Sequence, residues 1–158
     1  MNYGVLIDLD QTLVDSAALK PFRDARDWGR VQRSVHLSRA YDFASLFLNA
    51  IDQAQVPYGV VTSAPRSYAE SIVRHHGLTV SVVTAYHDTR SHKPHPAPLL
   101  HGLQTLGVST GVYIGDDEID ARAAEAAGIE FLLVNHAHGQ PLKELAAAVI
   151  ALATQSAR

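Results

Sequence analysis

The chain has 158 residues, of which 47% are hydrophobic and 18% are charged, and its formal net charge is −3. A chain of this length fits one compact domain that buries roughly 70% of the surface exposed by its unfolded form. The slightly acidic balance excludes a general attraction to nucleic acid or to an anionic membrane, so local charge must draw any anionic substrate. The absence of cysteine excludes disulfides and thiolate metal sites and is compatible with a reducing cytosol.

Neither end of the sequence predicts targeting or membrane insertion. The N-terminal segment reaches Asp8 after a short apolar stretch and lacks the basic start and long apolar core of a signal peptide. The apolar run Leu145–Ala153 is too short to span a bilayer. We therefore expect a cytoplasmic protein that does not enter a membrane.

The first predicted element is a strand over Tyr3–Leu9. This short aliphatic run has little polar alternation, which is typical of strands buried on both faces of a parallel sheet. The segment Asp15–Arg39 follows, with no predicted strand and an accumulation of basic residues. We interpret it as a short insert after the first strand, leading into a helix across roughly Tyr41–Gln55.

Strand-like and helix-like segments alternate along the rest of the chain. Further strands are predicted at Tyr58–Thr62, Val80–Ala85, Gly111–Gly115 and Glu130–Val134. Apolar stripes at helical spacing comprise Leu99, Leu103 and Leu106, and then Leu142, Leu145, Val149 and Leu152. Three helices are predicted to close at Gly77, Gly107 and Gly128, because glycine accepts the left-handed backbone of a helix end.

This alternation predicts an α/β fold with right-handed crossovers. The expected architecture is a doubly wound, Rossmann-like parallel sheet of five strands, with helices on both faces, in a single domain over residues 1–158. Ligands bind at the carboxyl ends of the strands in such folds. The residues that follow the strands are therefore the candidates for a functional site.

The first strand ends in two carboxylates, Asp8 and Asp10. Alternate residues of an extended chain face the same side, so both acids can point into one small volume. Two like charges this close repel unless a cation or a proton lies between them, and hard carboxylate oxygens suit Mg²⁺. The alternative is a pair of solvated aspartates at a strand end.

Two further segments carry groups suited to an anion. The second strand ends in Thr62 and Ser63, with Arg66 at the start of the next helix, where hydroxyl and backbone N–H groups can bind phosphate. Lys93 directly precedes Pro94 near another helix start and can neutralise a phosphate oxygen. An ordinary N-cap and a surface lysine are the alternatives.

The fourth strand ends in an acidic cluster that includes Asp116, Asp117 and Asp120. Acidic residues at a helix start also act simply as partners of the helix dipole. Carboxylates, a hydroxyl group, a lysine and this cluster are nevertheless all predicted at one edge of the sheet. Their convergence favours a site for phosphate and a metal ion.

The order and strand context of these segments resemble the motifs of the haloacid dehalogenase-like (HAD) hydrolase superfamily. The motifs are Asp8-Leu9-Asp10-Gln11-Thr12, Thr62, Lys93 and Gly115–Asp120. The resemblance covers nearly the whole predicted core. It implies a Mg²⁺-dependent phosphohydrolase that cleaves a phosphomonoester through an aspartyl-phosphate.

The resemblance also implies a role for each catalytic and phosphate-binding residue. Asp8 is the nucleophile, and Asp10 is the general acid and base. Thr62 binds the transferring phosphoryl group, with backbone contact from Ser63. Lys93 holds both a phosphoryl oxygen and the nucleophile.

The implied metal ligands are the side chain of Asp8, the carbonyl group of Asp10 and Asp116. Either Asp117 or Asp120 would support these ligands without binding the metal itself. Members that cleave carbon–halogen bonds carry no acid at the position of Asp10, so dehalogenase activity is disfavoured.

Two features depart from the pattern of many relatives. Gln11 stands where many of them have glycine. The insert at about 15–39 is too short for a helical cap domain, which predicts a phosphatase with a minimal cap and an open site. The insert residues expected to contact substrate are Arg23, Arg26, Trp28, Arg30 and Arg33, unless they form a solvated basic loop.

Other functions stay open at this point. The alternatives are a catalytically weak HAD-like domain that binds a partner and a phosphotransferase or mutase. A signalling receiver domain is disfavoured, because its phosphoacceptor follows the third strand. We expect a phosphorylated small molecule as substrate, with a phosphorylated macromolecule and a homo-oligomer left open. Histidines expected in solvent-facing loops, matching no zinc pattern, are His87, His92, His95, His136 and His138.

Overall fold

A computed structural model describes residues 2–157 of the chain. Its centre is a five-stranded parallel sheet in the order β5-β4-β1-β6-β7. The strands are β1 (Tyr3–Ile7), β4 (Tyr58–Val61), β5 (Val83–Thr84), β6 (Thr110–Gly115) and β7 (Glu130–Leu133). The predicted fold class is confirmed.

The middle strand, β1, is buried along its whole length. Ile7 is in register with Val60 of β4 on one side and with Ile114 of β6 on the other. The backbone N–H of Asp8 continues the ladder by donating to the carbonyl oxygen of Ile114 over 2.8 Å. The carboxyl ends of three neighbouring strands therefore meet where the first motif begins.

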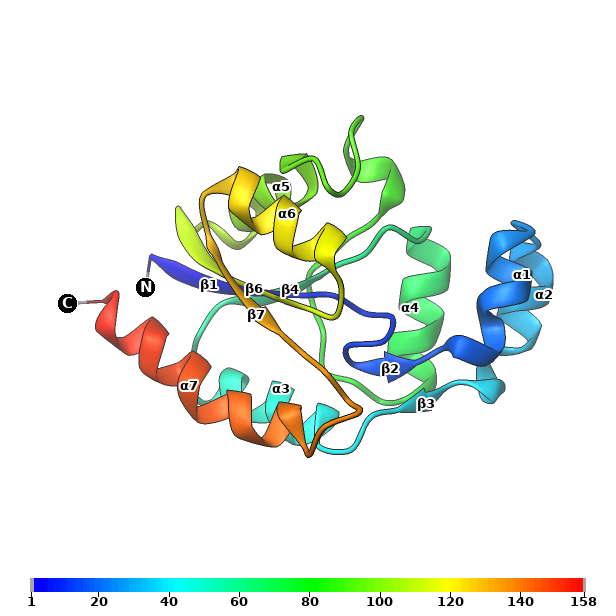
Figure 1. Cartoon of the computed structure of the whole chain (residues 1–158), viewed down its shortest axis with the longest axis horizontal. Helices are drawn as coiled ribbons and strands as arrows, with labels where there is room; N and C mark the ends of the chain where they lie inside the picture. The colour runs from blue at the N-terminus through cyan, green and yellow to red at the C-terminus, as the bar shows by residue number, and fades with distance from the viewer. Residues whose placement is uncertain (1, 158) are drawn as a thin grey trace.

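Helices cover both faces of the sheet (Figure 1). One face packs against α3 (Ala44–Gln53), α4 (Arg66–His75) and α7 (Pro141–Gln155), and the other against α5 (Ala97–Leu106) and α6 (Glu118–Ala127). Alternate residues of β1 divide between the two cores, with Ile7 in the first and Leu6 in the second. This is the period-two pattern of a strand buried on both sides.

The insert after β1 differs from its predicted form. Asp15 and Arg39, its expected ends, belong to two short antiparallel strands, β2 (Val14–Asp15) and β3 (Arg39–Ala40). The strands were missed because two residues are too few to show a period. Between them lie η1 (Ala17–Leu19), α1 (Lys20–Asp24), α2 (Trp28–Arg33) and η2 (Val35–Leu37).

The insert rests on α4 and on His76, the residue after it, through three separate contacts. The rings of Trp28 and Tyr68 are 5.9 Å apart. Ser71 Oγ donates to Gln32 Oε1 over 2.6 Å. Ser38 Oγ and His76 Nε2 are 2.8 Å apart. These contacts run along α4, so the helix that follows the second motif also positions the insert (Figure 1).

Some boundaries differ from the predicted ones. The third predicted strand shortens to β5, and the helix expected from residue 41 begins at Ala44, after Phe43 adopts a left-handed backbone with φ 67°. The glycine turns are confirmed, with φ 70° at both Gly107 and Gly128. A short helix, η3 (Tyr86–Asp88), follows β5. No helix within residues 2–157 is long and apolar enough to span a membrane.

Candidate active site

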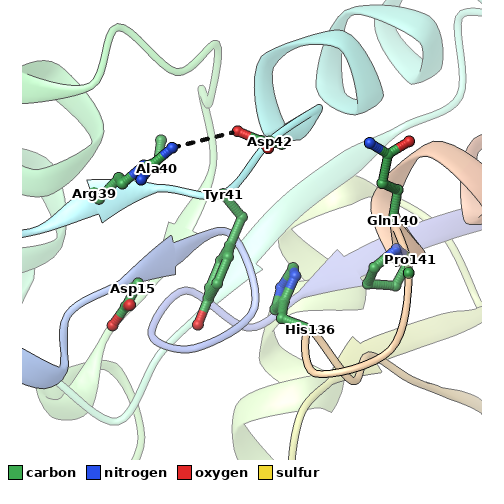
Figure 2. Close-up of a pocket in the computed structure, with 9 residues that line it drawn as sticks. Asp15, Arg39, Ala40, Tyr41, Asp42, His136, Gln140 and Pro141 are labelled. Carbon is green, nitrogen blue, oxygen red and sulfur yellow. Dashed lines mark ion pairs between the residues drawn. The ribbon is translucent and has the colours of Figure 1, made fainter.

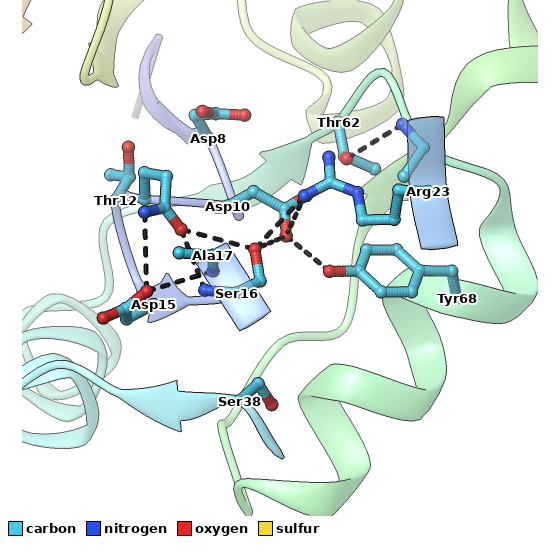
Figure 3. Close-up of polar contacts among 12 residues, drawn as sticks. Asp8, Asp10, Thr12, Asp15, Ser16, Ala17, Arg23, Ser38, Thr62 and Tyr68 are labelled. Atoms are coloured by element: carbon cyan, nitrogen blue, oxygen red, sulfur yellow. Dashed lines mark hydrogen bonds and ion pairs between the residues drawn. The ribbon is translucent and has the colours of Figure 1, made fainter. Parts of the chain in front are cut away.

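A pocket of about 400 Å³ opens at the carboxyl ends of β1, β4 and β6. The sheet supplies its floor, and η1 and α1 of the insert supply one wall. The side chains that line it include Asp8, Asp10, Ser16, Lys20, Arg23, Thr62, Ser63, Lys93, Asp116, Asp117 and Asp120. Figure 3 shows part of this group around Asp10. Most of the residues singled out from the sequence therefore lie together.

A tight turn carries the chain from β1 back toward the pocket. Asp8 directly follows β1 and is only 8% exposed. Gln11 has a left-handed backbone with φ 61°, and its N–H donates to the carbonyl oxygen of Val14 over 2.7 Å. Glycine adopts this conformation without steric cost, so Gln11 keeps the turn at a small conformational expense.

Lys93 lies at the centre of a buried polar network. Its side chain is 6% exposed, and Nζ is 3.1 Å from Asp8 Oδ1 and 2.7 Å from Asp120 Oδ1. Nζ also donates to the hydroxyl oxygen of Tyr113 over 2.7 Å, and that hydroxyl donates to Asp120 Oδ1 over 2.9 Å. The lysine thus links the first and fourth motifs.

Close packing at Gly115 gives Asp120 its position. A Cβ atom at Gly115 would lie 2.5 Å from Asp120 Oδ2, so only glycine allows this approach. The backbone N–H of Asp116 donates to the same oxygen over 3.3 Å. Asp117 instead caps α6 by accepting from the N–H of Asp120 over 2.9 Å. Asp120 is therefore the acid that contacts the buried lysine.

Burial and crowding shift the pKa values of this network. Burial raises the pKa of Asp8 well above its usual value, and the negative charges of Asp120 and Asp10 add to the rise, while Lys93 opposes it. The pKa of Asp116 is also raised, first by burial. Burial alone would lower the pKa of Lys93, but the negative charges of Asp8 and Asp120 have the larger effect. The pKa of this lysine is therefore raised, and its side chain stays protonated.

Asp10 is held by a different set of groups. Its Oδ1 accepts from Ser16 Oγ over 2.5 Å and from Tyr68 OH over 2.5 Å, and it lies 3.2 Å from Arg23 NH1 (Figure 3). Burial and the charge of Asp10 raise the pKa of Tyr68, so its hydroxyl keeps its proton. The sequence singled out Arg23 but neither Ser16 nor Tyr68.

The second motif lies at the end of β4. Thr62 is 4% exposed, and its Oγ1 accepts from the N–H of Ala64 over 3.1 Å, while Ser63 is exposed and lines the pocket. Arg66 lies outside the pocket, although it was expected to bind phosphate. Its guanidinium group is 2.5 Å from Asp88 Oδ2 and lines a separate depression beside β5.

Most of the chain, including the ends of β4 and β6, is matched by a protein family. The family model described as "Haloacid dehalogenase-like hydrolase" matches residues 23–134, which is more than half of the chain. The chain belongs to this family. The HAD match begins after Asp8 and Asp10, so their assignment depends on the geometry of the strand end and on the resemblance of the first motif.

The HAD relatives include phosphatases of known name. The chain is 34% identical over 133 residues to the N-acetylmuramic acid 6-phosphate phosphatase of Pseudomonas aeruginosa, covering 81% of this chain and 58% of the relative. It is 35% identical over 97 residues to a phosphoglycolate phosphatase of Xylella fastidiosa, covering 59% and 42%. The chain therefore spans only about half the length of these relatives.

A solved HAD structure has the same fold. The HAD-superfamily hydrolase from Ehrlichia chaffeensis superposes with a TM-score of 0.74 and covers 94% of this chain and 96% of its own. The sequences are 16% identical. The likeness is thus one of architecture.

The acidic residues of this HAD site suit a divalent cation. One oxygen from each of Asp8, Asp116 and Asp120 lies within 4.8 Å of the others. Because Asp120 is already bound by Lys93 and by the N–H of Asp116, we regard it as support for the other two. Within residues 2–157, the ion pairs made by the group Asp8, Asp10, Asp116 and Asp120 involve two cations, Lys93 and Arg23. A divalent cation would balance the two remaining negative charges.

The other insert residues expected to contact substrate are exposed to solvent or pack against the domain. Arg26, Arg30 and Arg33 are exposed and do not line the pocket. Trp28 packs against Tyr68. Of the insert residues expected to contact substrate, Arg23 alone lines the pocket within the described part of the chain.

A second depression is lined by residues of β2, of β3 and of the segment that follows β7 (Figure 2). His136 stacks on Tyr41 with ring centroids 3.3 Å apart, and its Nε2 is 2.8 Å from the carbonyl oxygen of Thr12. His136 is therefore partly buried and braces the first motif, in contrast with the solvent-facing loop expected from the sequence. The depression is about 270 Å³ in volume.

Proposed function

We propose that the chain is a Mg²⁺-dependent phosphatase that cleaves a phosphomonoester by transferring the phosphoryl group to Asp8. The observation that carries this proposal is a buried network at the carboxyl ends of the central strands. In this network Lys93 pairs with both Asp8 and Asp120. A buried carboxylate with a fixed cation beside it suits phosphoryl transfer, which depends on positioning and on charge neutralisation.

The reaction needs two proton transfers, both assigned to Asp10. In the first step an Asp8 oxygen bonds to phosphorus, the bond from phosphorus to the leaving oxygen breaks, and Asp10 gives that oxygen a proton. In the second step Asp10 takes a proton from water as the water oxygen bonds to phosphorus. The bond between phosphorus and the Asp8 oxygen breaks, which releases inorganic phosphate and regenerates the Asp8 carboxylate beside a protonated Asp10.

The remaining site residues bind and balance charge. Thr62 and Ser63 are proposed to hold the phosphoryl oxygens beside the start of α4, and Lys93 to neutralise one of them. Asp8, the carbonyl group of Asp10 and Asp116 would hold Mg²⁺. When bound, the ion supplies positive charge to the transferring phosphoryl group.

We propose a phosphorylated small molecule as the substrate. The similar phosphatases are named for N-acetylmuramic acid 6-phosphate and for phosphoglycolate, both small molecules. The pocket of about 400 Å³ falls within the size range of small-molecule sites. The insert at residues 15–39 would act as a minimal cap, with Lys20 and Arg23 facing the leaving group.

The test is phosphate release from a panel of phosphomonoesters in the presence of Mg²⁺. The wild-type protein should turn over at least one compound, and both EDTA and the variant Asp8→Asn should abolish the release. Asp52→Asn, which removes an exposed carboxylate from α3, is the matched control and should retain full activity. Normal turnover by Asp8→Asn would refute the proposed nucleophile.

A further inference from the structure

Three side chains from separate segments converge on one oxygen of Asp10 (Figure 3). Ser16 lies just after β2, Arg23 lies in α1 of the insert, and Tyr68 lies in the first turn of α4. Their polar atoms are 2.5, 3.2 and 2.5 Å from Asp10 Oδ1, respectively. The insert and the main domain thus meet at this oxygen.

The second oxygen of Asp10 is in a different situation. Among residues 2–157, no protein group donates a hydrogen bond to Oδ2. Asp10 nevertheless lines the catalytic pocket, and its side chain is 12% exposed. One oxygen is therefore occupied by the protein, and the other is left for a ligand.

Tyr68 is the most firmly placed of the three donors. Its side chain is 1% exposed, with the ring of Trp28 at 5.9 Å and the guanidinium carbon of Arg23 at 5.3 Å from its centroid. A buried ring in a helix has few alternative rotamers, so its hydroxyl stays on Asp10. Ser16 Oγ also donates to Asp10, but it accepts from Arg23 NH1 over 3.2 Å and lies 3.4 Å from a second acceptor, Gln11 Oε1.

We propose that Tyr68 is a positioning residue for acid–base catalysis, holding Oδ1 of Asp10 so that Oδ2 alone exchanges protons with the leaving group and water. The inference rests on the proposed phosphatase function. When the bond to the leaving oxygen breaks, the proton on Oδ2 moves to that oxygen. When water later attacks the aspartyl-phosphate, Oδ2 takes a proton from it.

A specific kinetic signature follows from this role. The leaving group of an alkyl phosphate is an alkoxide, which departs poorly unless its oxygen is protonated. The leaving group of 4-nitrophenyl phosphate is 4-nitrophenolate, which departs as the anion near neutral pH. The ratio kcat/KM reports the steps up to formation of the aspartyl-phosphate. Loss of positioning should therefore lower kcat/KM for the alkyl ester and leave that for 4-nitrophenyl phosphate nearly unchanged.

The experiment compares Tyr68→Phe with the wild type on glycerol phosphate and on 4-nitrophenyl phosphate, both with Mg²⁺. We expect kcat/KM to fall about 10- to 100-fold for glycerol phosphate, part of the usual contribution of a general acid, and less than about threefold for the aryl ester. Tyr58→Phe is the matched control, because it removes a buried hydroxyl that donates over 2.7 Å to Thr79, remote from the site.

The control should leave the ratio of the two kcat/KM values unchanged. A purely structural role for Tyr68 would lower both values equally, and that result would overturn the inference. Phosphate release by the wild type with equal losses in Tyr68→Phe would leave the proposed function intact. Failure of the wild type to hydrolyse either ester, or any compound of the panel, would overturn both.

Discussion

Two lysine–carboxylate pairs in this protein have the same length and opposite surroundings. Lys93 Nζ lies 2.7 Å from Asp120, and Lys20 Nζ lies 2.7 Å from Asp24. The first pair has side chains 6% and 2% exposed, whereas the second has side chains 68% and 64% exposed. Replacing each lysine by methionine therefore isolates the effect of burial.

Lys93→Met should destabilise the protein far more than Lys20→Met. The first change leaves Asp8 and Asp120 buried beside each other without a cation, and removal of one partner of a buried pair typically costs about 3–5 kcal/mol. An exposed pair contributes about 0–1 kcal/mol, so the second change should have little effect. In a domain of this size the first loss corresponds to a decrease in Tm of roughly 6–20 °C.

The assay is urea unfolding of both variants in EDTA at pH 7, with the free energy of unfolding compared with that of the wild type. Equal losses of stability in the two variants would refute the reasoning, because burial would then have no influence.

The same two variants can also be compared as a function of pH. Burial raises the pKa of Asp8 in the folded protein above the usual value of 3.8. Protonation of Asp8 therefore stabilises the folded state fully below pH 3.8, and this stabilisation is lost as the pH rises through the folded pKa. Lys93→Met should therefore recover stability as the solution is acidified from pH 7 toward the usual carboxyl value of 3.8.

Three further predictions concern the metal ion, the packing and the insert. Mg²⁺ at 100 times its Kd should stabilise the wild type by about 2.7 kcal/mol, measured by calorimetry, and Asp116→Asn should lose most of this gain; equal gains would contradict the assigned ligand. Gly115→Ala should lower the free energy of unfolding in urea by about 1–3 kcal/mol, because its Cβ would press on Asp120. Gly29→Ala, in α2 with its nearest neighbour at 3.4 Å, should be neutral or stabilising. The reverse order would contradict the packing. Trp28→Ala should speed limited proteolysis of the insert, since it removes the contact with α4; an unchanged rate would show that the other contacts suffice.

The sequence predicts the location of the site because the location follows from simple rules. Asp8, Thr62 and Asp116 each follow a buried aliphatic run, and parallel strands bring such ends to one edge. The fold class and the helix-closing glycines follow from local patterns in the same way. The short strands β2 and β3 carry no such pattern, because pairing across the insert creates them.

The contacts around Asp10 depend on tertiary packing that the sequence does not display. Tyr68 occupies an ordinary apolar position of an amphipathic helix, and only the folding of the insert onto α4 brings its hydroxyl to Asp10. Arg66 shows the opposite case. Its place after the second motif favours a phosphate ligand, but in the fold its guanidinium group turns toward β5 and pairs with Asp88.

The formation of a phosphoryl–enzyme bond at Asp8 tests the central claim most directly. The wild-type protein would be mixed with Mg²⁺ and a phosphomonoester that it hydrolyses, quenched in acid, reduced with borohydride and digested for mass spectrometry. Reduction converts a phosphorylated aspartate to homoserine, so the predicted result is homoserine at position 8 and unmodified aspartate at position 52. Homoserine at another aspartate, or none during active turnover, would contradict the assignment of Asp8 as the nucleophile.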